Sequence, residues 1–133
     1  MAGYATAVRN AKLQAIVTAI DAGSGNGTLT LYNGTKPATG AAITTQVALA
    51  DLTFPKPSGT ITGGVLTFGT ITADPSANVT GTATWLRIKD SAGTFVADFT
   101  VGTSSAEVII TTTSVVSGQQ VSITGFTITD GDP

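Results

Sequence analysis

One stretch constrains the fold more than any other, because a strand, a turn and a second strand can all be read from residues 81–101. Side chains alternate with a period of two from 82 to 89, and the sequence Asp-Ser-Ala-Gly at 90–93 supplies turn chemistry. Alternation resumes with the apolar set Phe95, Ala97, Phe99 and Val101. The only tryptophan of the chain and two of its five phenylalanines lie here. The stretch predicts a β-hairpin that supplies much of the bulk of the core.

The remainder of the chain also consists of short segments that are typical of strands and are separated by Gly, Pro, Asn and Asp. The other predicted strands are residues 28–32, 46–54, a short edge strand within 59–64, 65–72, 107–113 and 120–129. Seven or eight strands rich in Thr, Val and Ile predict a single all-β domain, a β-sandwich. A jelly roll and an immunoglobulin-like sandwich fit this pattern equally well, because they differ in connection order.

Residues 5–20 have the period of an amphipathic helix, for which Thr6 is the predicted N-cap. Its apolar stripe falls at positions i, i+3, i+4 and i+7 and consists of Leu13, Ile16, Val17 and Ile20. The stripe can cover its own domain, which is the commoner case, or a neighbouring subunit. The single domain, residues 1–133, thus divides into a helical arm at 1–22, a sandwich at 28–129 and a tail at 130–133.

The composition excludes several classes of function. Only 11% of the residues are charged, the net charge is −2 and the six basic residues are scattered, so nucleic acid is not an expected partner. The chain contains neither His nor Cys, which removes the commonest general base, the thiol nucleophile and the usual zinc ligands. The longest apolar segment, 13–20, is too short to cross a membrane. We expect no cofactor, no metal and no membrane span.

Carboxylates are the remaining candidates for catalysis. Of the eight carboxylates, Asp51 and Asp98 lie within predicted strands and could in principle form an acid and base pair of a glycosidase type. Both are expected instead to point into solvent from strands whose other face is apolar. The tail sequence Asp130-Gly131-Asp132 lacks the further spaced oxygen ligands of a calcium loop. We therefore predict that the protein is not an enzyme.

Trp85 and Arg87 alternate with Leu86 and Ile88, so a regular strand places the two pairs on opposite faces. If the Leu86 face is the core, Trp85 and Arg87 point outward. An outward Trp next to an Arg is typical of a protein interface, where both residue types are enriched. With Tyr32, Trp85 could instead form a platform on which a sugar stacks. The interface is the favoured interpretation.

The order of five segments resembles that of small virion proteins of tailed bacteriophages. The segments are LQAIVTAI at 13–20, LTLYNGTKP at 29–37, ADLTF at 50–54, GTATWLRIKDSAGT at 81–94 and FTITDG at 126–131. The resemblance implies a capsid decoration or cement protein with a jelly-roll-like fold. Such a protein is made in the host cytoplasm and binds as an oligomer to the major capsid protein on the outer face of the virion. No catalytic residues come with the resemblance.

The sequence therefore predicts a structural virion protein whose partners are the major capsid protein and further copies of itself, with a two-fold dimer favoured. The candidate interface residues are Trp85, Arg87, Leu13, Ile16, Val17 and Ile20. The alternative is a carbohydrate-binding or other ligand-binding sandwich module of a secreted protein. Whether the protein sits on capsid or tail stays open at this point.

Overall fold

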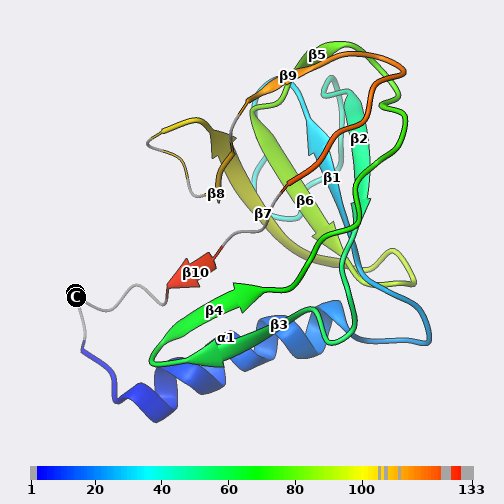
Figure 1. Ribbon diagram of the computed structural model, residues 1–133. Coiled ribbons are helices and arrows are strands. Elements are labelled where there is room, and N and C mark those ends of the chain that lie inside the picture. Colours follow the sequence, from blue (N-terminus) through cyan, green and yellow to red (C-terminus); the bar gives the residue numbers. More distant parts are fainter. Residues whose placement is uncertain (1–2, 105, 107, 111, 124–126, 130–133) are drawn as a thin grey trace.

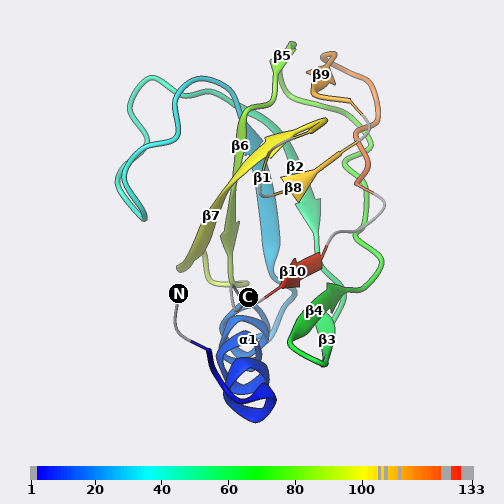
Figure 2. The same ribbon diagram turned by 90° about the vertical axis from the view of Figure 1, so that its left-hand side faces the viewer.

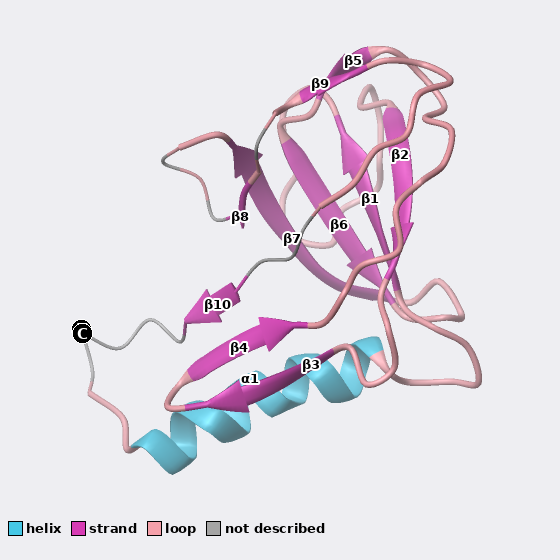
Figure 3. Cartoon of the chain, viewed as in Figure 1, coloured by secondary structure: helices cyan, strands magenta, loops and turns pink. Residues whose placement is uncertain are grey.

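A computed structural model describes residues 3–104, 106, 108–110, 112–123 and 127–129. The described chain is mostly strands, paired almost entirely in antiparallel sheets, with one helix near the N-terminus (Figures 1 and 3). The prediction of an all-β protein with a short N-terminal helix is therefore confirmed. The predicted tail at 130–133 lies outside the described residues.

The helix α1 (Thr6–Ile20) packs along strands β3 (Gly59–Thr62) and β4 (Val65–Phe68) of its own domain (Figure 1). Its predicted stripe faces this contact: Leu13, Val17 and Ile20 are buried, and Ile16 is partly buried against the same core. The helix begins at Thr6, and its N-cap residue is Ala5, which makes no side-chain cap. The prediction of Thr6 as N-cap is wrong, but the stripe covers its own domain as the commoner case predicts.

Five strands form the main sheet, in the order β2-β1-β6-β7-β8. All neighbours in this sheet are antiparallel except β7 and β8, which are parallel. The strands are β1 (Thr28–Tyr32), β2 (Ala48–Thr53), β6 (Trp85–Lys89), β7 (Phe95–Gly102) and β8 (Val108–Ile109). The central hairpin is thus present as β6 and β7.

Two smaller sheets complete the fold. One has the order β10-β4-β3, with β10 at Thr127–Thr129, and the other pairs β5 (Gly81–Thr82) with β9 (Ser114–Val115). The strand predicted from 82 to 89 is therefore broken, since β5 leaves the main sheet before β6 begins. The strands predicted at 107–113 and 120–129 are also much shorter than expected, because their described residues form only β8, β10 and an isolated bridge from Val121 to Asp74.

The hairpin contains an irregularity that changes which side chains share a face. Lys89 lies opposite Phe95, whereas Ile88 lies opposite Ala97, so Val96 is an extra residue on β7. Phe95 therefore points to the same face as Lys89, and Ala97 to the face of Ile88. The predicted common face of Phe95, Ala97, Phe99 and Val101 is wrong at its first member.

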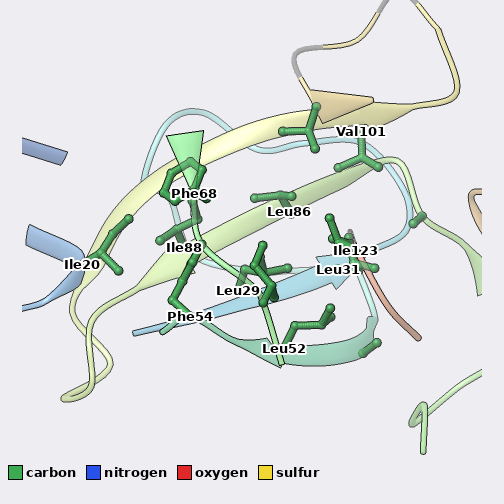
Figure 4. Close-up of a cluster of buried hydrophobic side chains, with 14 of the residues drawn as sticks. Ile20, Leu29, Leu31, Leu52, Phe54, Phe68, Leu86, Ile88, Val101 and Ile123 are labelled. Atoms are coloured by element: carbon green, nitrogen blue, oxygen red, sulfur yellow. The ribbon is translucent and has the colours of Figure 1, made fainter. Parts of the chain in front are cut away.

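The core lies between the inner face of the main sheet, the β3–β4 hairpin and α1 (Figure 4). Leu86 and Ile88 point into it and are fully buried, which confirms their predicted face. The largest fully buried apolar members from other elements include Ile20, Leu29, Leu31, Leu52, Phe54 and Leu66.

The free edge of the main sheet at β2 is covered. Thr53 exchanges backbone hydrogen bonds with Thr72, and the Asp51 N–H donates to the Asp74 carboxylate at 2.9 Å. A carboxylate thus takes the place of a strand carbonyl at this edge. Because an exposed edge invites pairing with another chain, this cover removes one route to association.

Candidate functional site

The outer face of the main sheet, opposite the core, carries a row of four polar side chains on four adjacent strands. Thr30 lies opposite Asp51 on one side and opposite Arg87 on the other, and Arg87 lies opposite Asp98. Residues directly opposite each other on neighbouring strands are close enough to interact. The topology therefore brings together carboxylate, hydroxyl, guanidinium and carboxylate groups that are far apart in the sequence.

Arg87 and Asp98 form a buried bidentate ion pair. The Arg87 Nε donates to Asp98 Oδ1 at 2.7 Å, and one terminal nitrogen donates to Oδ2 at 3.0 Å. The exposed fractions of the two side chains are 7% and 0%, so the partial exposure of Asp98 belongs to its backbone. The hydrogen bonding that Arg87 donates to the Asp98 carboxylate raises the pKa of Arg87. Two-pronged geometry and burial make this a strong, charge-assisted pair.

Aromatic rings surround the guanidinium. Its central carbon lies 5.4 Å from the ring centroid of Trp85 and 5.2 Å from that of Phe95. The Trp85 ring stacks on Tyr32, with centroids 4.5 Å apart and planes 14° from parallel. Burial raises the pKa of Tyr32. The cation and the rings form one compact cluster on the outer face.

The sequence correctly predicts the face of Trp85 and Arg87 but not their exposure. Trp85 is fully buried and Arg87 is 6% exposed, so the predicted contact patch is not open to a partner. The predicted sugar platform is likewise closed, because Tyr32 is buried and stacks on Trp85. These corrections have one physical cause, which is the loop that lies over this face.

The β1–β2 loop, residues 33–47, covers the cluster. In Figure 2 the loop, drawn in cyan, projects on the side of the main sheet opposite to β3, β4 and β9. Arg87 donates to the Ala41 carbonyl at 2.8 Å, and the Gly40 N–H donates to Asp98 Oδ2 at 3.1 Å. The Trp85 Nε1 donates to the Asn33 carbonyl at 3.0 Å. Sequence reasoning missed this cover, and its only signal was the length of the segment between two paired strands.

The two carboxylates considered for catalysis lie too far apart to act as a pair. Asp51 is exposed on β2 and accepts from the Thr30 hydroxyl at 2.6 Å and from Asn78 Nδ2 at 3.3 Å. Asp98 is three strand spacings away, roughly 14 Å, whereas a glycosidase pair stands about 5 to 9.5 Å apart. Each carboxylate is instead bound to structural partners, and Asp51 alone is exposed as predicted.

The helix residues named as interface candidates are not available to a partner either. Leu13, Val17 and Ile20 are buried in the core of their own domain, and Ile16 packs against it. The apolar stripe of α1 therefore covers its own domain and not a neighbouring subunit, and packing against the core holds the helix in place.

Two segments at one end of the molecule combine exposed apolar side chains with a sequence that contains no charged residue. Segments 77–86 and 108–123, which contain β5 and β9, have no Lys, Arg, Asp or Glu. Val79 and Val116 flank these two paired strands and are 39% and 42% exposed. The Ser117 N–H donates to the Thr80 hydroxyl at 2.9 Å and joins the two segments. We call this region the uncharged end; it lies opposite α1 (Figure 1).

A small hollow opens beside the uncharged end. Its volume is about 130 Å³, and its apolar lining includes Leu31, Val115 and Ile123. Pockets that enclose small-molecule ligands usually measure about 300 to 1,000 Å³. The hollow is therefore too small for a typical ligand.

The described part of the chain also bears on metals and membranes. It contains no group of three acidic, His or Cys residues that could hold a metal ion. None of its helices is long and apolar enough to cross a membrane.

No family model matches the chain, and neither a curated protein nor a solved structure matches it.

Proposed function

We propose that this protein is a structural, non-enzymatic virion protein that decorates or cements the outer face of a tailed-phage capsid. It binds the major capsid protein and stabilises the shell, and it acts as a homo-oligomer, for which a two-fold dimer is the simplest closed form. It is made in the host cytoplasm, and its sheets form a jelly-roll-like sandwich. The proposal starts from the resemblance of five sequence segments to small virion proteins.

The observation that carries the proposal is the difference in charge between the two ends of the molecule. The uncharged end presents Val79 and Val116 among Thr, Ser and Gly residues, whereas α1 at the other end carries Arg9 and Lys12. The centres of protein interfaces are depleted in charge, so the uncharged end is suited to pack against a shell protein. The charged end then faces solvent.

The engagement of the carboxylates also supports a structural role. Asp98 is bound to Arg87, and Asp51 is bound to Thr30 and Asn78. A general acid or base needs a free position from which it can exchange a proton with substrate. These groups are instead used to hold strands together.

Capsid binding can be tested with charges introduced at matched valines. Val116→Asp alters the uncharged end, and Val8→Asp alters an equally exposed position on α1, where Val8 is 46% exposed against 42% for Val116. Both variants should fold, because neither side chain is buried. Val116→Asp should fail to bind particles assembled from the major capsid protein, while Val8→Asp should bind like the wild type.

Two results would contradict the proposal. Washed virions from the source phage should contain the protein in copy number comparable to the shell protein, and its absence from them would exclude a decoration role. Equal particle binding by Val116→Asp and the wild type would exclude the uncharged end as the docking surface.

The alternative is a ligand-binding module of a secreted protein. It loses the observation that favoured it, because Tyr32 and Trp85 stack on each other and are buried. Binding to a glycan array without particle binding would favour this alternative.

A further inference from the structure

We propose that the β1–β2 loop is a strap that opens as a unit while the main sheet stays folded. Its latch is the Arg87–Asp98 pair, and its release exposes Trp85 and Tyr32. The strap would act as a gate over an aromatic surface that the closed molecule hides. This inference rests on the geometry of the outer face and is independent of the proposed function.

The length and burial of the loop are those of a separate unit. It spans residues 33–47 between two directly paired strands, whereas β-hairpin loops usually have about 2 to 5 residues. Long loops without secondary structure are uncommon in compact domains and are usually functional or disordered. No residue from Gly34 to Gln46 is buried. The loop therefore covers the buried Trp85 without contributing a buried side chain of its own.

The loop is held at two places. At its base, Asn33 and Val47 are joined by two hydrogen bonds, of 3.2 and 2.7 Å. The base also accepts from the Thr84 hydroxyl at Gly34, at 2.6 Å, and from Trp85 Nε1 at Asn33. At its tip, Gly40 donates to Asp98 and Ala41 accepts from Arg87. A closed base and a tip held by one ion pair are the features of a hinged flap, because the base can stay intact when the tip leaves.

The main cost of opening is the exposure of the Trp85 and Tyr32 rings, because the ion pair of the latch does not depend on the loop. Arg87 and Asp98 keep both of their mutual hydrogen bonds when the tip leaves. Only one donor and one acceptor lose their loop partners, and water can replace these once the surface is wet. Segments that bury few apolar groups open at a free energy well below that of global unfolding. The exposed surface would then present Trp, Tyr and Arg, the residue types most enriched at the centres of interfaces.

Opening of the loop can be followed by tryptophan fluorescence, because Trp85 is the only tryptophan in the chain. Its fully buried ring should resist quenching of its fluorescence by acrylamide in the closed state. Gly40→Ala should loosen the tip: Gly40 has φ +73°, and an added Cβ would lie 3.1 Å from the Phe95 ring. The left-handed strain vanishes when the tip leaves, so the open fraction should rise about fivefold or more.

Gly118→Ala is the matched control. Gly118 has φ +83°, a Cβ added there would meet no other atom within 4 Å, and the residue lies in a turn outside the strap. The substitution imposes the same kind of backbone strain without touching the latch. Gly40→Ala should increase the quenching constant of Trp85 several-fold in native buffer, while its urea midpoint falls no further than that of Gly118→Ala.

Amide hydrogen exchange on the wild type provides a second measurement that needs no variant. The Gly40 N–H should exchange at least about tenfold faster than the hydrogen-bonded amides of β6, and with less dependence on denaturant. Equal protection of Gly40 and β6 would overturn the proposal. So would a Gly40→Ala protein whose Trp85 quenching equals that of Gly118→Ala, or rises only in step with global unfolding.

Discussion

Replacing Asp98 by Asn tests whether the Arg87–Asp98 pair is a buried ion pair in energetic terms. The substitution keeps the shape of the side chain and removes its charge, while the guanidinium cannot lose its proton at any accessible pH. The Arg87 side chain is only 7% exposed, so its charge is left almost without water or a counter-ion. Removing one partner of a buried pair costs about 3 to 5 kcal/mol. That is a large part of the ~5 to 15 kcal/mol that stabilises a typical domain.

Urea unfolding followed by circular dichroism measures the loss, and Asp51→Asn is the control. Asp51 is the exposed carboxylate at the other end of the same polar row, and its replacement should cost no more than about 1 kcal/mol. A double variant with apolar residues at 87 and 98 should regain much of the stability, since it leaves no unpaired charge. A loss below about 1 kcal/mol for Asp98→Asn would show that water solvates Arg87 and would refute the reasoning.

Three further predictions follow from burial. Trp85→Ala should destabilise the fold by ~3 to 5 kcal/mol in a denaturant melt, as truncation of a fully buried Trp does, and a loss near zero would contradict its burial. Val17→Asp should unfold the domain because it buries a charge under α1, whereas Val8→Asp on the exposed side of the same helix should keep its melting temperature. Burial raises the folded-state pKa of Tyr32 above its ordinary value of 10.0, so stability that is complete below pH 10.0 should be lost as the pH rises through the raised pKa. Tyr32→Phe should lose less stability than the wild type over that range, and equal losses would exclude Tyr32 as the cause.

Much of the fold could be predicted from periodicity alone. The period of two placed Leu86 and Ile88 in the core, and the helical period found the buried face of α1. Both patterns work because burial of one face is enforced by the whole domain. The strands that the sequence predicts after residue 104 are too long, because a Thr- and Val-rich sequence has strand propensity whether or not a partner strand is there.

The candidate site was less predictable, because alternation assigns a side chain to a face but does not say what covers that face. The β1–β2 loop consists mainly of small and polar residues without a period, so nothing in it predicts that it lies over Trp85. The usual inference that the second face of an antiparallel strand is solvated then fails. The burial of Arg87 is equally hard to predict, because its pairing with Asp98 depends on the register between β6 and β7.

Val96 decides which face Phe95 occupies. Strict alternation back from Ala97 would turn Phe95 toward the core, whereas the extra residue places it opposite Lys89 on the outer face, with its ring 5.2 Å from the Arg87 guanidinium carbon. Asp98 lies opposite Arg87 on the same face, so the two buried charges neutralise each other. The paired charges then offer one donor and one acceptor to the loop tip, and the loop in turn seals Trp85 from water. A single irregularity in one strand thus places the Phe95 ring beside both the guanidinium and Gly40 at the tip of the loop.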